Sequence, residues 1–239
     1  MLFLHGFPDS WNSFRPVLDL LSLRYRAIAI DQRGFGDSSR PADGYSQTQF
    51  AADAAAFLDE LSIDEAVVVG HSLGSFVAQT LALDYPGRVR RLVLIGSAPT
   101  AAGSPVLEEV LGEVLELSDP IDPEFVREFQ TSTFSGELPD GFLDTIVAES
   151  LKAPAFVWRA PLEGLAVEDH RAHLAKITQP TFVAWGDQDV IFTREDQGAV
   201  VRALPGSVLK VYEGAGHSLN WDHAVDFTRD LEEFLALGD

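Results

Sequence analysis

Short apolar runs alternate along the chain with longer stretches of helical periodicity. The runs are rich in β-branched residues and contain almost no polar position, which is typical of strands buried on both faces of a mostly parallel sheet. They cover residues 1–4, 27–30, 66–69, 92–95, 181–185 and 208–212. Because helical patterns separate these runs, the sequence predicts an α/β fold with an open, doubly wound sheet.

The helical stretches carry their own boundary signals. Ser46 and Gln49 have the spacing of a capping box and precede apolar positions that recur at helical intervals up to Leu61. Residues 73–85 are apolar on nearly every side and stop before Pro86, which predicts a deeply buried helix. A final apolar stripe predicts a helix over residues 224–235.

One long segment breaks the alternation. Between residues 97 and 180 no run has the pattern of a strand, whereas several apolar stripes indicate helices. We therefore expect a core formed by residues 1–98 and 176–239, with residues 99–175 inserted as a helical lid over one end of the sheet.

The strongest chemical signal follows the third apolar run. Gly70-His71-Ser72-Leu73-Gly74 has the pattern G-x-S-x-G between a predicted strand and the buried helix. A turn this tight leaves no room for side chains at the two glycine positions and exposes the serine hydroxyl, while the helix that follows directs its N-terminal N–H groups towards an oxyanion. Ser72 is therefore the predicted nucleophile.

With this motif in place, the whole chain resembles the α/β-hydrolase superfamily, and in particular its lid-bearing serine hydrolases. His5-Gly6-Phe7-Pro8 resembles the loop that forms part of the family's oxyanion hole, so the resemblance assigns the backbone N–H groups of Phe7 and Leu73 to that role. The segment from Asp31 to Ser38 resembles the family's D-x-R-G-x-G-x-S turn, which implies that Asp31 and Arg33 are structural.

A serine nucleophile needs a general base that a third group orients. The family supplies these in the order serine, acid, histidine, and His217 follows the last strand in a glycine-rich loop. Asp187 and Asp189 both follow the preceding strand. The family's G-x-x-D turn selects Asp189 as the acid, whereas Asp187 is expected to cap the turn.

Related chemistries fit the residues less well. Epoxide hydrolases and dehalogenases of this fold use an aspartate nucleophile, where this chain has Ser72, and the chain has no tyrosine in the inserted segment. Asp169, His170 and His173 have a spacing that could bring two imidazoles together, but a third ligand is missing, so a solvated helix is the preferred interpretation. No cofactor and no metal are expected.

The substrate is less well defined by the sequence. Candidate substrate-binding residues are His71, Phe125, Phe129, Phe142 and Trp158, although these aromatic residues could equally pack the lid on the core. The predicted reaction is hydrolysis of a carboxylic ester or lactone through an acyl-enzyme on Ser72. The same three residues would also serve a carbon–carbon bond hydrolase, a cofactor-free perhydrolase or a ligand receptor with slow turnover.

Charge and composition limit the classes of partner and substrate that the chain is expected to bind. The chain has 37 acidic and 17 basic residues and a net charge of −20, which disfavours nucleic acid and anionic membranes. Residues 100–175 hold 15 acidic and 4 basic residues, so neutral esters are expected to be preferred over anionic ones. In this segment four glutamates are expected on a solvated helix face: Glu108, Glu109, Glu113 and Glu116. The absence of cysteine leaves Ser72 as the only nucleophile in a catalytic setting.

The N-terminal residues give expectations about the compartment of the protein and about one edge of its sheet. There is no basic region before the first apolar run, and no apolar stretch approaches the roughly 20 residues of a membrane helix, so a soluble, cytoplasmic protein is expected. Compared with the family, the hairpin before the first strand is missing, which would leave the strand at residues 27–30 as an open edge. A truncated start or a covering element, such as the lid or a second copy in a homodimer, would account for this.

Overall fold

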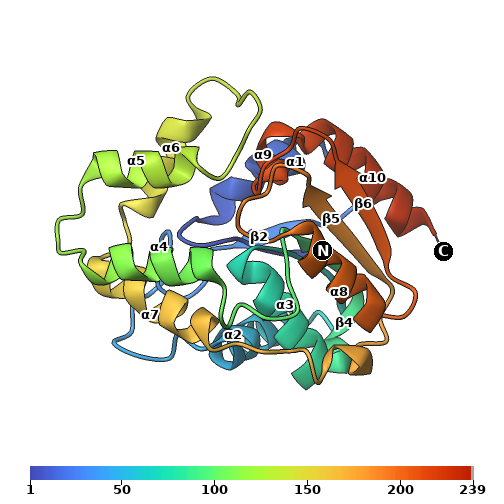
Figure 1. Cartoon of the computed structure of the whole chain (residues 1–239). Coiled ribbons are helices and arrows are strands. Elements are labelled where there is room, and N and C mark those ends of the chain that lie inside the picture. Colours follow the sequence, from blue (N-terminus) through green and yellow to red (C-terminus); the bar gives the residue numbers. More distant parts are fainter. Residues whose placement is uncertain (238–239) are drawn as a thin grey trace.

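Six parallel strands form the centre of the molecule in the computed structural model, which describes residues 1–237 (Figure 1). The sheet order is β2-β1-β3-β4-β5-β6, and every neighbouring pair is parallel. The strands are β1 (Leu2–Leu4), β2 (Ile28–Ile30), β3 (Ala66–His71), β4 (Val89–Ile95), β5 (Thr181–Gly186) and β6 (Val208–Tyr212). The predicted α/β class is confirmed, and each predicted run corresponds to one strand.

Helices cover both faces of this sheet. Successive residues of a strand point to opposite faces, so Leu2 and Leu4 join one buried cluster while Phe3 joins the other. The first cluster includes residues of α2 (Gln47–Glu60), α3 (Leu73–Asp84) and α8 (Arg194–Ala203). The second includes residues of α1 (Arg15–Leu20), α9 (Leu219–Asp222) and α10 (Ala224–Ala236). Ten of the twelve residues of α3 are buried, as its apolar sequence predicts.

Four helices are inserted between β4 and β5 and lie together beside the sheet in Figure 1. They are α4 (Pro105–Leu115), α5 (Pro123–Thr131), α6 (Phe142–Ser150) and α7 (Ala155–Ala166), and α4 packs on α7 as α5 packs on α6. The only β-pairing within residues 96–180 is a single bridge between Thr100 and Asp169. We call α4–α7 the inserted helices.

Two local expectations were wrong. Ser46 accepts the N–H of Gln49, but the Gln49 side chain donates to Asp53 Oδ1 at 3.1 Å instead of closing a capping box. The segment around His170 is not a solvated helix. His170 is buried. Its Nδ1 donates to Gln79 Oε1 at 3.0 Å and its Nε2 lies 3.1 Å from Thr80 Oγ1, and these two contacts join the end of the inserted segment to α3.

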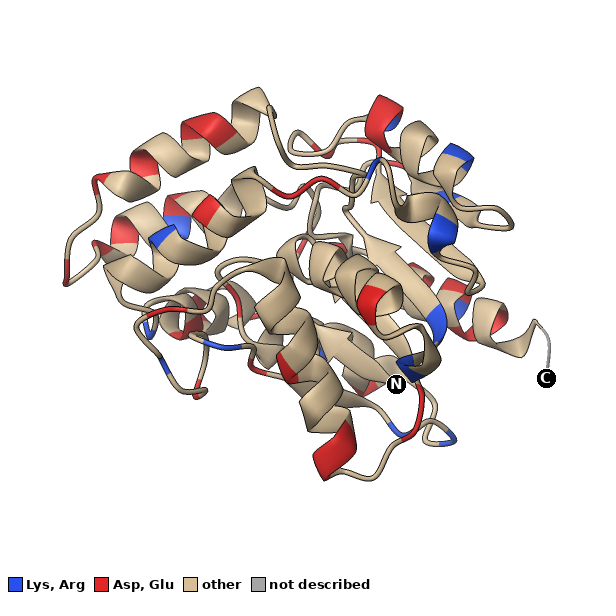
Figure 2. Ribbon diagram, turned by 90° about the horizontal axis from the view of Figure 1, so that it is seen from below, with Lys and Arg blue, Asp and Glu red and all other residues tan. Residues whose placement is uncertain are grey.

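Acidic residues outnumber basic ones across this framework. Figure 2 shows acidic residues on helices throughout the molecule and comparatively few basic positions. No helix within residues 1–237 is long and apolar enough to cross a membrane.

Candidate active site

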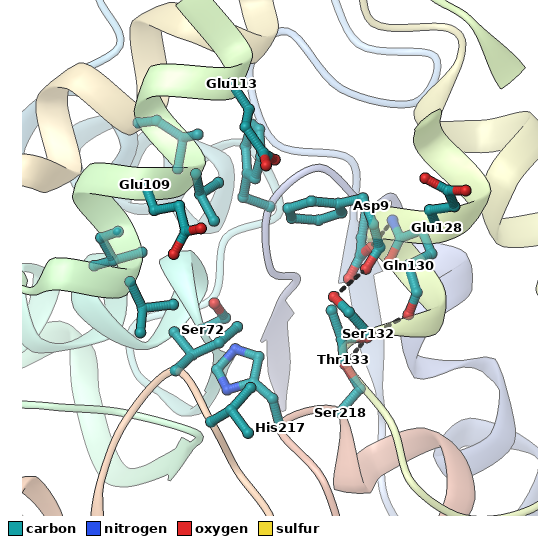
Figure 3. A pocket seen from close by; sticks show the side chains of 18 of the residues that line it. Asp9, Ser72, Glu109, Glu113, Glu128, Gln130, Ser132, Thr133, His217 and Ser218 are labelled. Carbon is teal, nitrogen blue, oxygen red and sulfur yellow. Dashed lines mark hydrogen bonds between the residues drawn. The ribbon is translucent and has the colours of Figure 1, made fainter. Parts of the chain in front are cut away.

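Ser72 and His217 line one cavity of about 470 Å³, within the range of small-molecule sites (Figure 3). Its apolar wall comes mainly from the inserted helices, and its floor comes from the segments that follow β1, β3, β5 and β6. Its lining residues are Phe7, Asp9, His71, Ser72, Val106, Leu107, Glu109, Val110, Glu113, Phe125, Glu128, Phe129, Gln130, Ser132, Thr133, Leu162, Leu165, Val190, Ile191, His217 and Ser218.

The backbone at Ser72 has the strained geometry that the motif requires. Its φ of 51° is unusual for a residue with a side chain, and such strain persists only where the surroundings enforce it. A Cβ on Gly70 would lie 2.2 Å from the carbonyl oxygen of Gly74, and one on Gly74 would lie 2.1 Å from the carbonyl oxygen of Leu4. The close approach of β1, β3 and α3 therefore explains both glycines and holds Ser72 at the end of β3.

His217 and Asp189 form a buried pair. His217 Nδ1 donates to Asp189 Oδ2 at 2.9 Å, and Asp189 Oδ1 accepts the N–H groups of Ile191 and Phe192 at 2.8 and 3.1 Å. These bonds place the imidazole proton on Nδ1 and leave Nε2 as an acceptor. Nε2 is buried and has no hydrogen-bond partner within residues 1–237.

The loop that carries His217 packs tightly on its neighbours. A Cβ on Gly96 would lie 2.8 Å from the His217 ring, and one on Gly186 would lie 2.2 Å from the carbonyl oxygen of Ala215. The next residue, Ser218, donates its N–H to the carbonyl oxygen of Thr133 at 2.8 Å. The imidazole is thus fixed both by the strand ends and by the chain that follows α5.

Two backbone N–H groups lie unpaired beside the nucleophile. Neither the N–H of Phe7 nor that of Leu73 donates a hydrogen bond to another described residue. Leu73 is the first residue of α3, and a Cβ on Gly6 would lie 3.1 Å from the Ser72 Cβ, which places the Phe7 loop next to Ser72. Unpaired N–H groups at a helix N-terminus favour an anion.

His71 lies between the nucleophile and the histidine loop. Its ring centroid is 5.0 Å from that of His217, and its Nε2 donates to the His217 carbonyl oxygen at 3.2 Å. Burial, followed by the nearby His217, lowers the pKa of His71 well below its usual value. A neutral His71 adds no positive charge that would oppose protonation of His217.

The other motif residues hold the scaffold. Asp31 accepts the N–H groups of Trp11 and Asp37, while Arg33 makes two 2.7 Å bonds to Asp53. His5 is buried, and burial lowers its pKa to about 4. None of these residues lines the cavity.

Asp187 lies outside the buried pair. It is exposed, and its Oδ1 accepts the N–H of Gly214 at 2.8 Å, which ties the turn after β5 to the turn after β6. Of the two aspartates that the sequence offers, it is Asp189 that contacts His217.

The predicted aromatic residues separate into two groups. Phe125 and Phe129 line the cavity, and Trp158 packs behind them with its ring centroid 5.7 Å from that of Phe129. Phe142 is not among the lining residues. Instead, its ring centroid lies 5.6 Å from that of Trp221, because α6 turns its apolar side towards α9.

One wall of the cavity is polar, and the sequence did not predict it. Asp9, Gln130, Thr133 and Ser218 line the cavity, and Figure 3 shows them on the side opposite Glu109. The only sequence signal was that Asp9 follows the oxyanion-loop motif directly. The four glutamates predicted on a solvated helix face are exposed as expected, three in α4 and Glu116 directly after it, but Glu109 and Glu113 also border the cavity.

Metal binding has no support from the geometry. Within residues 1–237 no cluster of three or more His, Cys, Asp or Glu side chains is arranged to hold an ion. His170 instead contacts Gln79 Oε1 through Nδ1 at 3.0 Å and Glu168 Oε1 through Nε2 at 2.9 Å.

Comparison with known proteins identifies the family. Residues 1–224 match the family described as alpha/beta hydrolase fold, and the chain belongs to it. A 2-hydroxymuconate semialdehyde hydrolase of Pseudomonas sp. (strain CF600) is 31% identical, and the alignment covers 100% of this chain and 87% of the relative. A putative non-heme chloroperoxidase of Synechocystis sp. is 29% identical over 98% of this chain and 90% of its own. The predicted superfamily is confirmed.

A solved structure agrees with this assignment. An esterase from Exiguobacterium antarcticum superposes with a TM-score of 0.89 at 26% identity, covering 98% of this chain and 90% of the esterase. The relatives thus share one fold but carry names of different activities.

Proposed function

We propose that this protein is a serine hydrolase that cleaves a carboxylic ester or lactone without negative charge through an acyl-enzyme on Ser72. The observation that carries the proposal is the buried His217–Asp189 pair, whose unpartnered Nε2 belongs to the same cavity as a serine with a left-handed backbone. The inserted helices, within residues 99–175, act as the lid over this cavity.

In the first half of the reaction Ser72 Oγ attacks the carbonyl carbon while His217 Nε2 takes its proton. The N–H groups of Phe7 and Leu73 stabilise the oxyanion of the tetrahedral intermediate, a contribution usually worth about 3–4 kcal/mol per donor. The bond to the leaving oxygen then breaks, and His217 returns the proton to that oxygen. Asp189 stabilises the imidazolium throughout.

In the second half a water molecule attacks the acyl-enzyme. His217 takes one proton from the water as the new carbon–oxygen bond forms, and the bond to Ser72 Oγ breaks. The proton then passes to Ser72 Oγ, which restores the enzyme and releases the carboxylic acid. No group outside these residues is needed for the proton balance.

A carbon–carbon bond hydrolase is the second candidate, because one relative is a 2-hydroxymuconate semialdehyde hydrolase. A muconate carries a carboxylate, which a pocket would be expected to bind with a cationic side chain. The described residues that line this cavity include four carboxylic acids and no Lys or Arg. This composition favours a substrate without a negative charge.

The test is a panel of neutral and anionic p-nitrophenyl esters of increasing acyl length, together with lactones. We expect turnover of the neutral substrates and a fall in kcat of about 10⁴-fold or more in Ser72→Ala. Alanine tolerates the backbone at this position no worse than serine, so the variant should fold, which thermal unfolding checks. Turnover by Ser72→Ala at the wild-type rate would overturn the assignment.

A further inference from the structure

Asp9 is a buried carboxyl group that the hydrolytic reaction does not use. It follows the Phe7 loop, is 2% exposed, and lines the cavity opposite Glu109 (Figure 3). Its Oδ1 accepts a hydrogen bond from Gln130 Nε2 at 3.0 Å, whereas its Oδ2 accepts none from any described residue. One oxygen of the group is therefore left for a ligand.

Among the described residues, the only donor to the Asp9 carboxyl group is shared. Gln130 Nε2 also donates to Ser150 Oγ at 2.9 Å, so one amide supplies a single N–H to the carboxyl group. Buried carboxylates are normally paired with a cation or held by several donors, because burial without such partners is costly. Burial raises the pKa of Asp9 to about 7, as expected for a site that lacks its counter-ion.

The elements around Asp9 supply no lasting positive charge. The inserted helices contribute Glu109 and Glu113 from α4 and Glu128 from α5, while α6 reaches Gln130 through the uncharged Ser150. Two histidines also line the cavity, and because burial lowers the pKa of His71 well below its usual value, the remaining candidate for a cation is His217. That ring is already paired with Asp189, whose carboxylate balances any positive charge on it.

We propose that the cavity takes an ester whose acyl or alcohol part carries a cationic ammonium group, and that Asp9 is the residue that pairs with it. The proposal rests on hydrolysis at Ser72 for its reaction, although the ammonium site itself is defined by Asp9. Glu109, Glu113 and Glu128 at the border of the cavity favour entry of the same charge. The apolar wall of α4, α5 and α7 receives the alkyl part.

A matched pair of substrates tests this charge preference. One is the p-nitrophenyl ester of γ-trimethylammoniobutyric acid, and the other is its carbon analogue with a tert-butyl group in place of the trimethylammonium. We expect kcat/KM to favour the cationic ester. Because protons compete with the ammonium group for Asp9, this preference should rise about tenfold from pH 6 to pH 8, as the ionised fraction does. The ratio of the two esters cancels any pH dependence of the catalytic steps that both esters share.

The matched variants are Asp9→Asn and Glu108→Gln. Asparagine keeps the shape and can still accept from Gln130, but it cannot pair with a cation, so the preference and its pH dependence should both disappear. Glu108 is exposed and does not line the cavity, and its substitution removes one charge from α4 without altering the site. Equal kcat/KM for the two esters in the wild type, or a preference that survives Asp9→Asn, would overturn the proposal.

Binding without turnover separates this proposal from the hydrolytic one. The methyl ketones that correspond to the two acids cannot be hydrolysed, and calorimetry measures their affinity directly. Tighter binding of the ammonium ketone, lost in Asp9→Asn, supports the Asp9 site even if no ester is cleaved. Turnover of neutral esters by Ser72 with no binding preference between the ketones would overturn the Asp9 site and leave the hydrolase assignment intact.

Discussion

The cavity has two sides that are built by different means. On the strand-end side, Ser72 and His217 are held by backbone contacts so close that a methyl group would collide, as at Gly74 and Gly186. On the side of the inserted helices, aromatic rings form much of the cavity wall, and Gly103, Gly112 and Gly141 have no atom within 4 Å of an added Cβ, although Gly164 of α7 packs closely on the backbone of Tyr45. The proposed chemistry thus lies on rigid backbone, whereas substrate contacts lie on exchangeable side chains.

On the strand-end side, a substitution that keeps the size of one side chain should be enough to abolish most of the activity. Asp189→Asn keeps the size of the side chain but removes the charge that orients and stabilises the His217 imidazolium, so kcat should fall about 10⁴-fold. Asp187→Asn is the matched control, since this exposed side chain contacts the next turn and not His217. We expect it to retain kcat within about twofold, as measured with a neutral p-nitrophenyl ester. Equal losses in the two variants would contradict the assignment of the acid.

The contrast in backbone packing between the two sides can be measured with two glycine-to-alanine substitutions. At Gly74 the added Cβ would lie 2.1 Å from a carbonyl oxygen of β1, so Gly74→Ala should lower the free energy of unfolding by about 3 kcal/mol. At Gly112, inside α4, the space is open, so Gly112→Ala should raise the free energy of unfolding by about 0.5–1 kcal/mol. Urea denaturation gives both values. Two changes of the same sign would mean that the two sides do not differ in this way.

The strand-end side was largely predictable from the sequence. Its strands are continuous apolar runs, and the sharp turn at Ser72 depends on glycines at fixed spacing, so the local pattern carries the geometry. Placing Asp189 and His217 required the family resemblance, because the turns that hold them meet only in the folded sheet. The turn at Ser72 depends on backbone contacts close to the motif, whereas the His217–Asp189 hydrogen bond joins side chains 28 positions apart.

The other side was not predictable in the same way. Phe129 and Phe142 both lie on apolar helical stripes, and only the packing of α5 and α6 decides that the first lines the cavity while the second contacts Trp221. Asp9 was missed because its burial depends on Gln130, a residue 121 positions away. Such side-chain contacts between distant segments leave no periodic signal.

Asp9 joins the two sides, and its burial has a pH-dependent cost. Its pKa is raised from 3.8 to about 7 in the folded protein, so between these values the folded state binds more protons than the unfolded chain. Stability therefore falls as pH rises through this window. Asp9→Asn removes the effect, and its gain in free energy of unfolding over wild type should grow by about 2–3 kcal/mol between pH 5 and pH 8. Asp140→Asn, at an exposed position, is the control; a gain that is independent of pH would contradict the buried carboxyl group.

The smallest expected effect concerns the aromatic wall. The Phe129 ring stands nearly perpendicular to Phe7 at 5.9 Å and borders the cavity, so Phe129→Ala should widen the site and raise KM for an aromatic or long-chain ester about 3–10-fold. Because no proposed catalytic group moves, kcat should change less than KM. Phe142→Ala removes a ring of the same size from the same set of helices, but one that packs on Trp221, so it should lower the thermal unfolding temperature without raising KM. If Phe142→Ala raised KM as much as Phe129→Ala does, selectivity would depend on the inserted helices as a unit and not on the rings that face the cavity.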